Sequence, residues 1–431
     1  MSAIHPSTAG DAASALYSKL NWRLLPFLVA CYMFAYLDRV NVGFAKIQMQ
    51  SDLGFSDAAY GVGAGIFFLG YVLFEIPSNL MLPRIGARLT FSRILVLWGI
   101  TSACMLFVQN VSAFYAMRFL LGVFEAGFAP GMIYYLSCWY GPARMARAIA
   151  LVFAAGPLGG IIGGPTSAWL MTALSGVWGL AGWQWMFLVE GIPCVALGLL
   201  TLRVLSDRPA DAAWLSDDEK LLLERESAPT HHRADSFKDV LRSPRVYVLA
   251  IAYFSLIFPI YAISFWLPTL LKDQGVDDTI RLGWYVAIPY LAAAFGMYFA
   301  GRRSDRVGER RYHCAIPALA AAACLIAAIF SDGSLTLTLV SMTAATACLW
   351  MAYTVFWAIP SQLVEGTAAA GGIALINTVG LSGGFWGPAV FGWTRTWTGN
   401  MHMGLVVMAC TAMVSAILIL TGKLTLAKKP V

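Results

Sequence analysis

Charged side chains are scarce in this chain. Asp, Glu, Lys and Arg make up 12% of its 431 residues, whereas soluble proteins devote about a quarter of their residues to them. Apolar residue types account for 59%, and the mean hydropathy is +0.69. This composition excludes an ordinary soluble domain and predicts a chain that lies mostly in lipid.

The sequence also lacks the patterns of several other protein classes. The net charge is +6, but no basic stripe alternates with stacking aromatic residues, so we expect no nucleic-acid partner. The eight cysteines lie in or beside apolar stretches without a CxxC spacing, and no histidine pair has metal-ligand spacing. No nucleophile–base arrangement stands out. We therefore expect no enzyme, no metal and no cofactor.

Long apolar stretches dominate what remains. A bilayer core of about 30 Å requires roughly 20 apolar residues per helix, and the first stretch, from Leu24, is too long for a cleaved signal peptide. The length criterion predicts an all-α integral membrane protein with twelve spans, near 24–45, 60–82, 91–109, 112–139, 148–173, 183–204, 245–271, 281–301, 313–331, 335–360, 370–395 and 402–422.

One long polar stretch divides these spans into two sets of six. In it, Ser216 and Glu219 have the spacing of a capping box, which predicts a short amphipathic helix. The predicted organisation is an N-terminal tail, a six-helix bundle, a linker, a second bundle and a C-terminal tail, at 1–20, 21–204, 205–244, 245–422 and 423–431.

Basic residues are distributed unevenly between the two sets of loops. If the N-terminus is cytoplasmic, nearly all Lys and Arg residues outside the spans fall on the cytoplasmic side, and the exceptions are Lys46, Lys272, Arg281 and Arg395. Because cytoplasmic loops of membrane proteins are rich in Lys and Arg, both termini are expected in the cytoplasm.

The two halves carry matching landmarks. "NLMLPRIGAR", from Asn79, follows the second span, and "GRRSDRVGER", from Gly301, follows the eighth. Asn79 and Gly301 are 222 residues apart, and the Gly-Pro pairs that begin at Gly164 and Gly387 are 223 residues apart. An internal six-helix repeat is therefore predicted, and such repeats build transporters with a central site near the bilayer midplane.

These loops resemble the major facilitator superfamily. The second loop matches the family's cytoplasmic signature G-x-x-x-D-R-x-G-x-R, whereas the first departs from it because Asn79 and Pro83 replace the Gly and the Asp. The resemblance implies two pseudo-symmetric bundles and a cytoplasmic gate motif formed by Gly301, Asp305, Arg306, Gly308, Arg310, Arg84 and Arg88.

Longer motifs narrow the resemblance. "YLDRVNVGFA", "FLGYVLFEIPSN", "RFLLGVFEAGFAPG" and "GWQWMFLVEGIP" are similar to the anion:cation symporter family, including bacterial permeases for tartrate, phthalate, 4-hydroxyphenylacetate and aldonate acids. This resemblance implies a monomeric bacterial inner-membrane permease that carries a small organic anion with a proton.

Charged residues inside the spans are the main candidates for function, since each is costly in hydrocarbon unless it faces a cavity or a partner. Arg118 and Glu125, seven residues apart, project from one helix face, whereas the neighbours Asp38 and Arg39 point about 100° apart. Burial raises a carboxyl pKa and a nearby Arg lowers it, so a substrate anion competing for the Arg would let the carboxylate take a proton.

We therefore hypothesise that Asp38 and Glu125 bind the coupling proton, as the resemblance also implies, and that Arg39 or Arg118 receives the substrate carboxylate. The alternative is that Arg118 and Glu125 form a fixed structural pair. Glu75 and Glu190 are expected instead to bind backbone or Arg partners near the membrane interface. Further candidates for the substrate site, matched to the related permeases, are Tyr71, Trp357 and Asn377.

Two other functions remain open from the sequence. An organic-anion exchanger would use the same Arg residues without titrating Asp38. A transporter-like sensor would need a sizeable output domain, for which the linker and tail offer no room.

Overall fold

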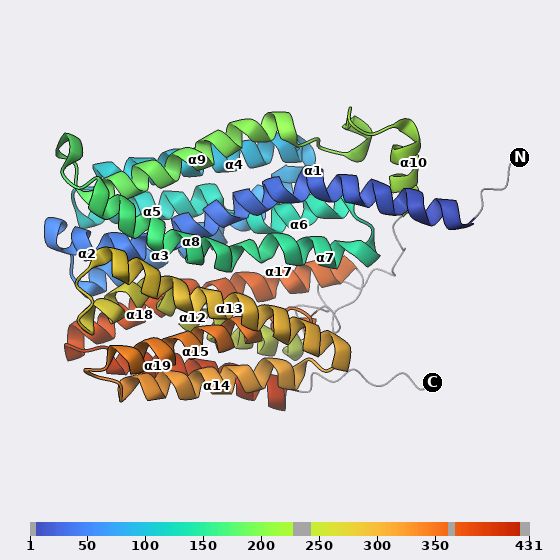
Figure 1. The fold of residues 1–431 in the computed structure, drawn as a ribbon. Coiled ribbons are helices and arrows are strands. Elements are labelled where there is room, and N and C mark those ends of the chain that lie inside the picture. Colours follow the sequence, from blue (N-terminus) through green and yellow to red (C-terminus); the bar gives the residue numbers. More distant parts are fainter. Residues whose placement is uncertain (1–5, 227–242, 361–366, 423–431) are drawn as a thin grey trace, which may run out of the picture.

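The computed structural model describes residues 6–226, 243–360 and 367–422 of the chain, and within them it contains helices and no strands (Figure 1). Prolines and glycines lie inside many of these helices without ending them. The α-helices are α1 (Pro6–Val40), α2 (Val42–Leu53), α3 (Asp57–Ile85), α4 (Ala87–Ala103), α5 (Val111–Glu125), α6 (Phe128–Trp139), α7 (Pro142–Phe153), α8 (Ala155–Ala173), α9 (Gly182–Val204), α10 (Asp217–Glu226), α12 (Pro244–Asp273), α13 (Thr279–Val307), α14 (Arg311–Ile329), α15 (Leu335–Phe356), α17 (Thr367–Leu381), α18 (Gly383–Thr398) and α19 (His402–Thr421).

Twelve helical segments in the described part of the chain are long and apolar enough to cross a membrane. The predicted twelve-span fold is therefore confirmed, although α1 begins at Pro6, inside the predicted N-terminal tail. Several spans consist of two consecutive helices, such as Val111–Trp139, which contains α5 and α6. Parts of the predicted tails and linker (1–5, 227–242 and 423–431) lie outside the described residues.

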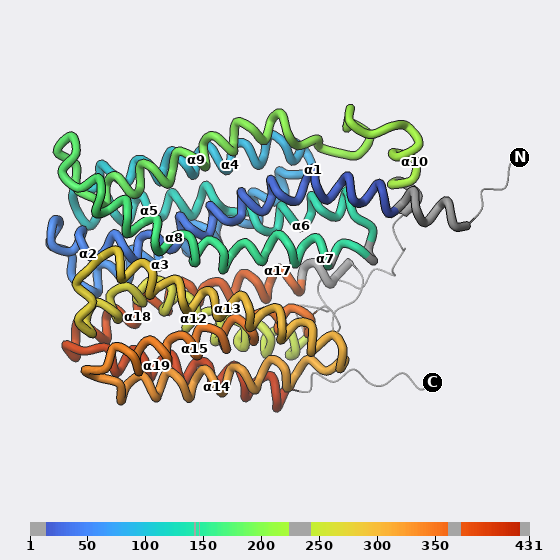
Figure 2. Tube along the Cα trace, in the orientation of Figure 1, coloured from blue at the N-terminus to red at the C-terminus, as the bar shows by residue number. Residues whose placement is uncertain are grey.

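The helices form two bundles (Figures 1 and 2). Helices α1 to α9 make one bundle and α12 to α19 the other, and their main contacts are α3 with α18, α8 with α13, and α2 with α12. The second span of the first bundle therefore packs against the fifth span of the second bundle, and the second span of the second bundle (the eighth) packs against the fifth span of the first. This reciprocal contact pattern is that of a pseudo-two-fold axis.

Glycine allows the bundles to approach closely. A Cβ at Gly61 of α3 would lie 2.4 Å from the carbonyl oxygen of Pro388 on α18, and one at Gly164 of α8 would lie 2.7 Å from that of Gly283 on α13. Small residues at such contacts let the helix backbones lie close together.

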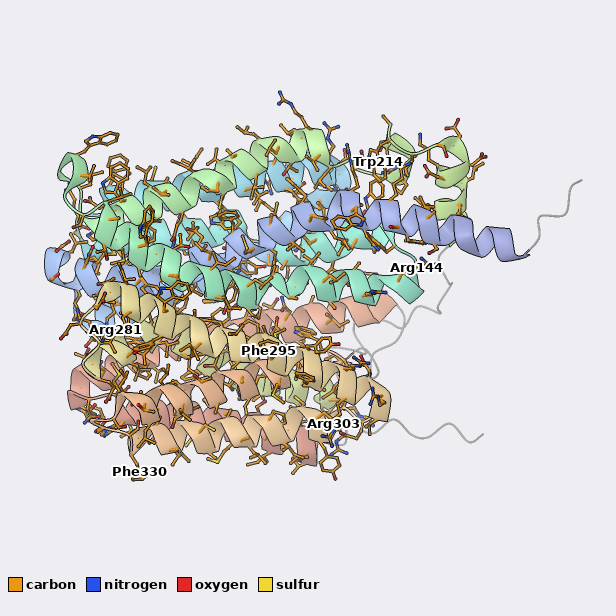
Figure 3. The ribbon with its side chains drawn as sticks, in the orientation of Figure 1. Arg144, Trp214, Arg281, Phe295, Arg303 and Phe330 are labelled. Carbon is orange, nitrogen blue, oxygen red and sulfur yellow. The ribbon has the colours of Figure 1, made fainter. Side chains whose placement is uncertain are left out.

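The two ends of the molecule differ. We call the end that carries α10 and the start of α1 the linker end, and the opposite end, with α2, the far end (Figure 1). Figure 3 places Arg144 and Arg303 at the linker end and Arg281 at the far end.

At the linker end, α10 docks on the first bundle. Ser216 and Glu219 form the predicted capping box, with the Glu219 backbone N–H donating to Ser216 Oγ and the Ser216 N–H donating to Glu219 Oε2. Lys19 of α1 forms an ion pair with Glu219 at 2.8 Å, and Trp214 stacks on Trp139.

Candidate substrate and proton site

Two membrane spans are interrupted beside their charged residues. Asn41 separates α1 from α2 just after Asp38 and Arg39, and Gly127, with φ +87°, separates α5 from α6 just after Glu125. Interrupted helices are tolerated at membrane depth where they are buried in protein or line a cavity. Both breaks are buried.

Arg39 is the centre of the charged cluster. Its guanidinium forms a buried ion pair with Glu125 and donates to the hydroxyl of Tyr261 at 2.8 Å. Arg39 and Tyr261 are 222 residues apart, the spacing of the internal repeat, so these two equivalent positions meet between the bundles.

Aromatic rings surround this guanidinium. Its carbon lies 5.3 Å from the ring centre of Phe67, 5.9 Å from that of Tyr261 and 6.0 Å from those of Phe68 and Tyr71. Cation–π attraction of this kind contributes about 2 kcal/mol when the cation is desolvated. A planar or partly apolar anion could replace Glu125 as partner of Arg39 and still contact these rings.

Asp38 points away from Arg39, as expected for neighbours on a helix. Its carboxylate accepts hydrogen bonds from Trp98 Nε1 and Ser102 Oγ of α4 and from Asn41 Nδ2. Asp38 makes no ion pair among the described residues. Neutral donors therefore stabilise this buried carboxylate.

Arg118 has a different environment from Arg39. It is fully buried, and it donates to the backbone carbonyls of Gly63 and Ala64 on α3 at 3.3 and 3.1 Å. The alternative in which Arg118 and Glu125 form a fixed pair is wrong, because Glu125 pairs with Arg39 while Arg118 is used to hold α3 against α5.

The uncharged candidates fall into two groups. Tyr71 lies in the ring cluster around Arg39. Trp357 packs against Tyr253, with ring centres 4.8 Å apart, and Asn377 donates to Glu75 Oε1 at 2.7 Å across the bundle interface. The structure therefore brings Tyr71, but neither Trp357 nor Asn377, into contact with the Arg39 cluster.

The expected environments of Glu75 and Glu190 are wrong. Glu75 accepts from Asn377 of the other bundle, and Glu190 accepts from Ser167 and Asn41 inside the first bundle, so neither carboxylate has an Arg partner within the described residues. The sequence marked Glu75 and Glu190 only as charges within predicted spans and did not indicate their partners. Asn41, three residues after Asp38, was missed although that spacing places both residues on one helix face.

Ionic contacts join the bundles at the far end. Asp57 of α3 binds Lys46 of α2 at 2.8 Å and Arg395 of α18 at 3.2 Å, and Arg395 also binds Asp273 of α12 at 2.9 Å. The Lys46 ammonium lies 4.0 Å from the ring centre of Trp266. These four charged residues, the far-end cluster, hold the two bundles together at this end.

The predicted gate motif makes its hydrogen bonds and ion pairs within each half. In the second half, Asp305 binds Arg310 at 2.7 Å, Gly308 ends α13 with φ +70°, and Gly301 lies within α13. Arg84 and Arg306 are exposed.

In the first half, the missing Asp has a substitute that the sequence did not reveal. Asp207, after α9, accepts from the backbone N–H of Arg88 at 2.9 Å, at the start of α4. Gly86 (φ +93°) allows this approach, since a Cβ there would lie 2.7 Å from the Asp207 carboxylate. The Arg88 side chain donates to the carbonyl of Leu202 as Arg311 donates to that of Leu420 in the second half.

Two repeated six-helix bundles, with a buried ion pair of the first beside a tyrosine of the second, are the plan of a secondary transporter. The chain belongs to the Major Facilitator Superfamily, whose family model matches residues 28–388. The sequence-based assignment to this superfamily is therefore confirmed.

The chain is 45% identical over 418 residues to the "Putative metabolite transport protein NicT" of Pseudomonas putida KT2440, covering 96% of each chain. It is 42% identical over 419 residues to a "Putative tartrate transporter" of Agrobacterium vitis, covering 95% of each. A solved bacterial homologue of the human lysosomal transporter Spinster, inward-facing and occupied, shares the fold with a TM-score of 0.77 at 17% identity, covering 92% of this chain and 96% of its own.

Proposed function

We propose that this chain is a secondary active transporter that carries a small organic carboxylate together with a proton. The observation that supports this proposal most strongly is the buried Arg39–Glu125 pair beside the hydroxyl of Tyr261 from the other bundle. The name of the tartrate transporter to which the chain is similar agrees with a small organic anion.

Coupling follows from the competition for Arg39. A substrate carboxylate that binds Arg39 separates the guanidinium from Glu125, and a buried carboxylate without its cation takes up a proton. Proton and substrate then favour each other's bound state, with a coupling free energy of about 1–3 kcal/mol.

Each candidate residue has a role in this mechanism. Glu125 and Asp38 bind protons, Arg39 binds the substrate carboxylate, and Tyr71, Trp357 and Asn377 line the path of the substrate. Arg118 serves the scaffold, because its Nε and Nη2 donate to the α3 backbone.

Alternating access uses the two ends of the molecule. The far-end cluster closes one side, and the linker end carries the gate motif and most basic residues, so we place the linker end in the cytoplasm of a bacterial inner membrane. The transported species would then pass between the bundles by a rocking motion about the central pair.

The test is uptake into proteoliposomes that contain the purified chain, with radiolabelled tartrate, phthalate, nicotinate and galactonate as probes. An inward proton gradient should drive accumulation of at least one acid, and Glu125→Gln should abolish accumulation while anion exchange persists. Uptake that ignores the gradient but requires an internal anion would instead identify an exchanger and overturn the proton-coupling proposal.

A further inference from the structure

Two buried carboxylates in the first bundle share one amide. Asn41 Nδ2 donates to Asp38 Oδ1 at 3.1 Å and to Glu190 Oε2 at 2.9 Å, which uses both of its N–H bonds. The other oxygen of Glu190 lies 2.7 Å from Ser167 Oγ. Asp38 and Glu190 are 1% and 3% exposed, so water does not solvate either group.

Ionising both carboxylates at once is energetically unfavourable in this arrangement. Through one nitrogen the two oxygens are at most about 6 Å apart, and like charges at this separation in a low-dielectric interior disfavour joint ionisation. Among the described residues neither carboxylate has a cation partner; the charged groups that act on Asp38 are Arg118 and Glu125 of α5, and the one that acts on Glu190 is Asp38.

The donors show which carboxylate carries the charge. Asp38 receives hydrogen bonds from three side chains, two of them on α4. Glu190 has only the Asn41 amide and the Ser167 hydroxyl, and a hydroxyl can equally accept a hydrogen bond from a protonated carboxyl. The environment therefore favours an ionised Asp38 and a protonated Glu190.

We propose that Asp38, Asn41 and Glu190 form one proton-binding unit, in which Glu190 keeps a proton while Asp38 is ionised and acts on Asp38 through Asn41. Glu190 is thus a positioning residue for the coupling carboxylate. This inference rests on the proposed role of Asp38 in proton coupling.

The location of Asn41 links this unit to the conformational cycle. Asn41 lies at the break between α1 and α2, and α2 carries Lys46 of the far-end cluster. Opening of the far end moves α2, which changes the hydrogen bond from Asn41 to Asp38 and with it the proton affinity of the unit.

Infrared difference spectroscopy of the full chain in lipid, with pH steps and no substrate, tests the proposal. The carbonyl stretch of a protonated carboxyl should be present at pH 7 and lost in Glu190→Gln. In Asp38→Asn the pH midpoint of this band should fall by about one unit or more, because the opposing charge is gone. Glu75→Gln is the matched control: it removes a different buried carboxyl and should leave the midpoint of the Glu190 band unchanged.

If Glu190→Gln does not fold, Ser167→Ala gives the second readout, because loss of the hydroxyl acceptor should shift the Glu190 band to higher frequency. A wild-type spectrum without the Glu190 band at pH 7, or a midpoint unchanged in Asp38→Asn, would overturn the proposal. Since no substrate is present, a failed uptake experiment and a failed infrared experiment remain distinguishable.

Discussion

The two bundles share a fold but differ in what they bury. In the described chain, every buried Asp, Glu, Lys or Arg belongs to the first bundle, whereas the buried polar residues of the second are Ser and Thr only. At equivalent positions one repeat length apart, Asp38 corresponds to Ile260 and Glu75 to Met297.

The second bundle contributes aromatic surface instead. Its α12 is largely buried and supplies Tyr261, which binds Arg39, and Trp266, which packs on Tyr60, to the interface. The bundles also differ where equivalent positions of the repeat meet. Arg39 of the first bundle donates to the hydroxyl of Tyr261 of the second, and Lys46 donates to that of Thr269, 223 residues away. Among the described residues, the first bundle thus holds the buried charged side chains, while the second meets them with hydroxyl and aromatic groups.

The largest expected effect is at the Arg39–Tyr261 contact. Arg39→Gln leaves Glu125 buried without its cation, a loss of about 3–5 kcal/mol, so the initial rate of uptake should fall more than about 100-fold. Tyr261→Phe removes one hydrogen bond, about 1–1.5 kcal/mol, and should reduce uptake by roughly 10-fold. Equal losses in the two variants would contradict a division of roles between the bundles.

Substitutions of Arg118 test whether this residue stabilises helix packing or belongs to the substrate site. Arg118→Met frees two carbonyls of α3 and should lower the free energy of unfolding by about 3 kcal/mol, seen as a lower melting temperature in detergent. Arg118→Lys should not restore stability, because an ammonium cannot reproduce the guanidinium fork. The matched control is Val340→Ala, one repeat later and exposed, which should leave the melting temperature unchanged. An unaltered melting temperature in Arg118→Met would make Arg118 a site residue.

The far-end cluster should control which side is closed. Arg395→Gln removes the contacts with Asp57 and Asp273, about 1–2 kcal/mol, and should raise amide hydrogen exchange at the far ends of α2, α3 and α18 by several-fold. Arg281→Gln, an exposed basic residue at the same end (Figure 3), should leave exchange unchanged. Equal exchange in the two variants would exclude a closing role for the cluster.

The smallest effect concerns α10. The hydrogen bond from Lys19 lowers the pKa of Glu219 below its usual range. A depressed pKa stabilises the docked helix above the usual Glu pKa, and this contribution is lost as the pH falls through the lowered value. The effect should be roughly 0.5 kcal/mol, since the pair is exposed. Hydrogen exchange of α10 should therefore rise below about pH 4 in wild type, and a Glu219→Gln variant should lack this pH dependence.

Much of the fold could be predicted because it depends on local rules. Span length, the repeat landmarks and the capping box of Ser216 and Glu219 each follow from residues close together in the chain or from a pattern that lipid imposes. The charges to examine were also visible, since lipid makes every charge within a span conspicuous.

The sequence by itself thus determined the membrane architecture, the repeat and the list of buried charges. Only the tertiary structure decided their partners: Arg39 rather than Arg118 for Glu125, Asn41 for Glu190, Asn377 for Glu75, and Asp207 in place of the missing loop carboxylate. The physical reason is that a helix fixes only the direction of a side chain along its own axis. Which group it meets depends on how that helix is rotated and packed against helices distant in the chain.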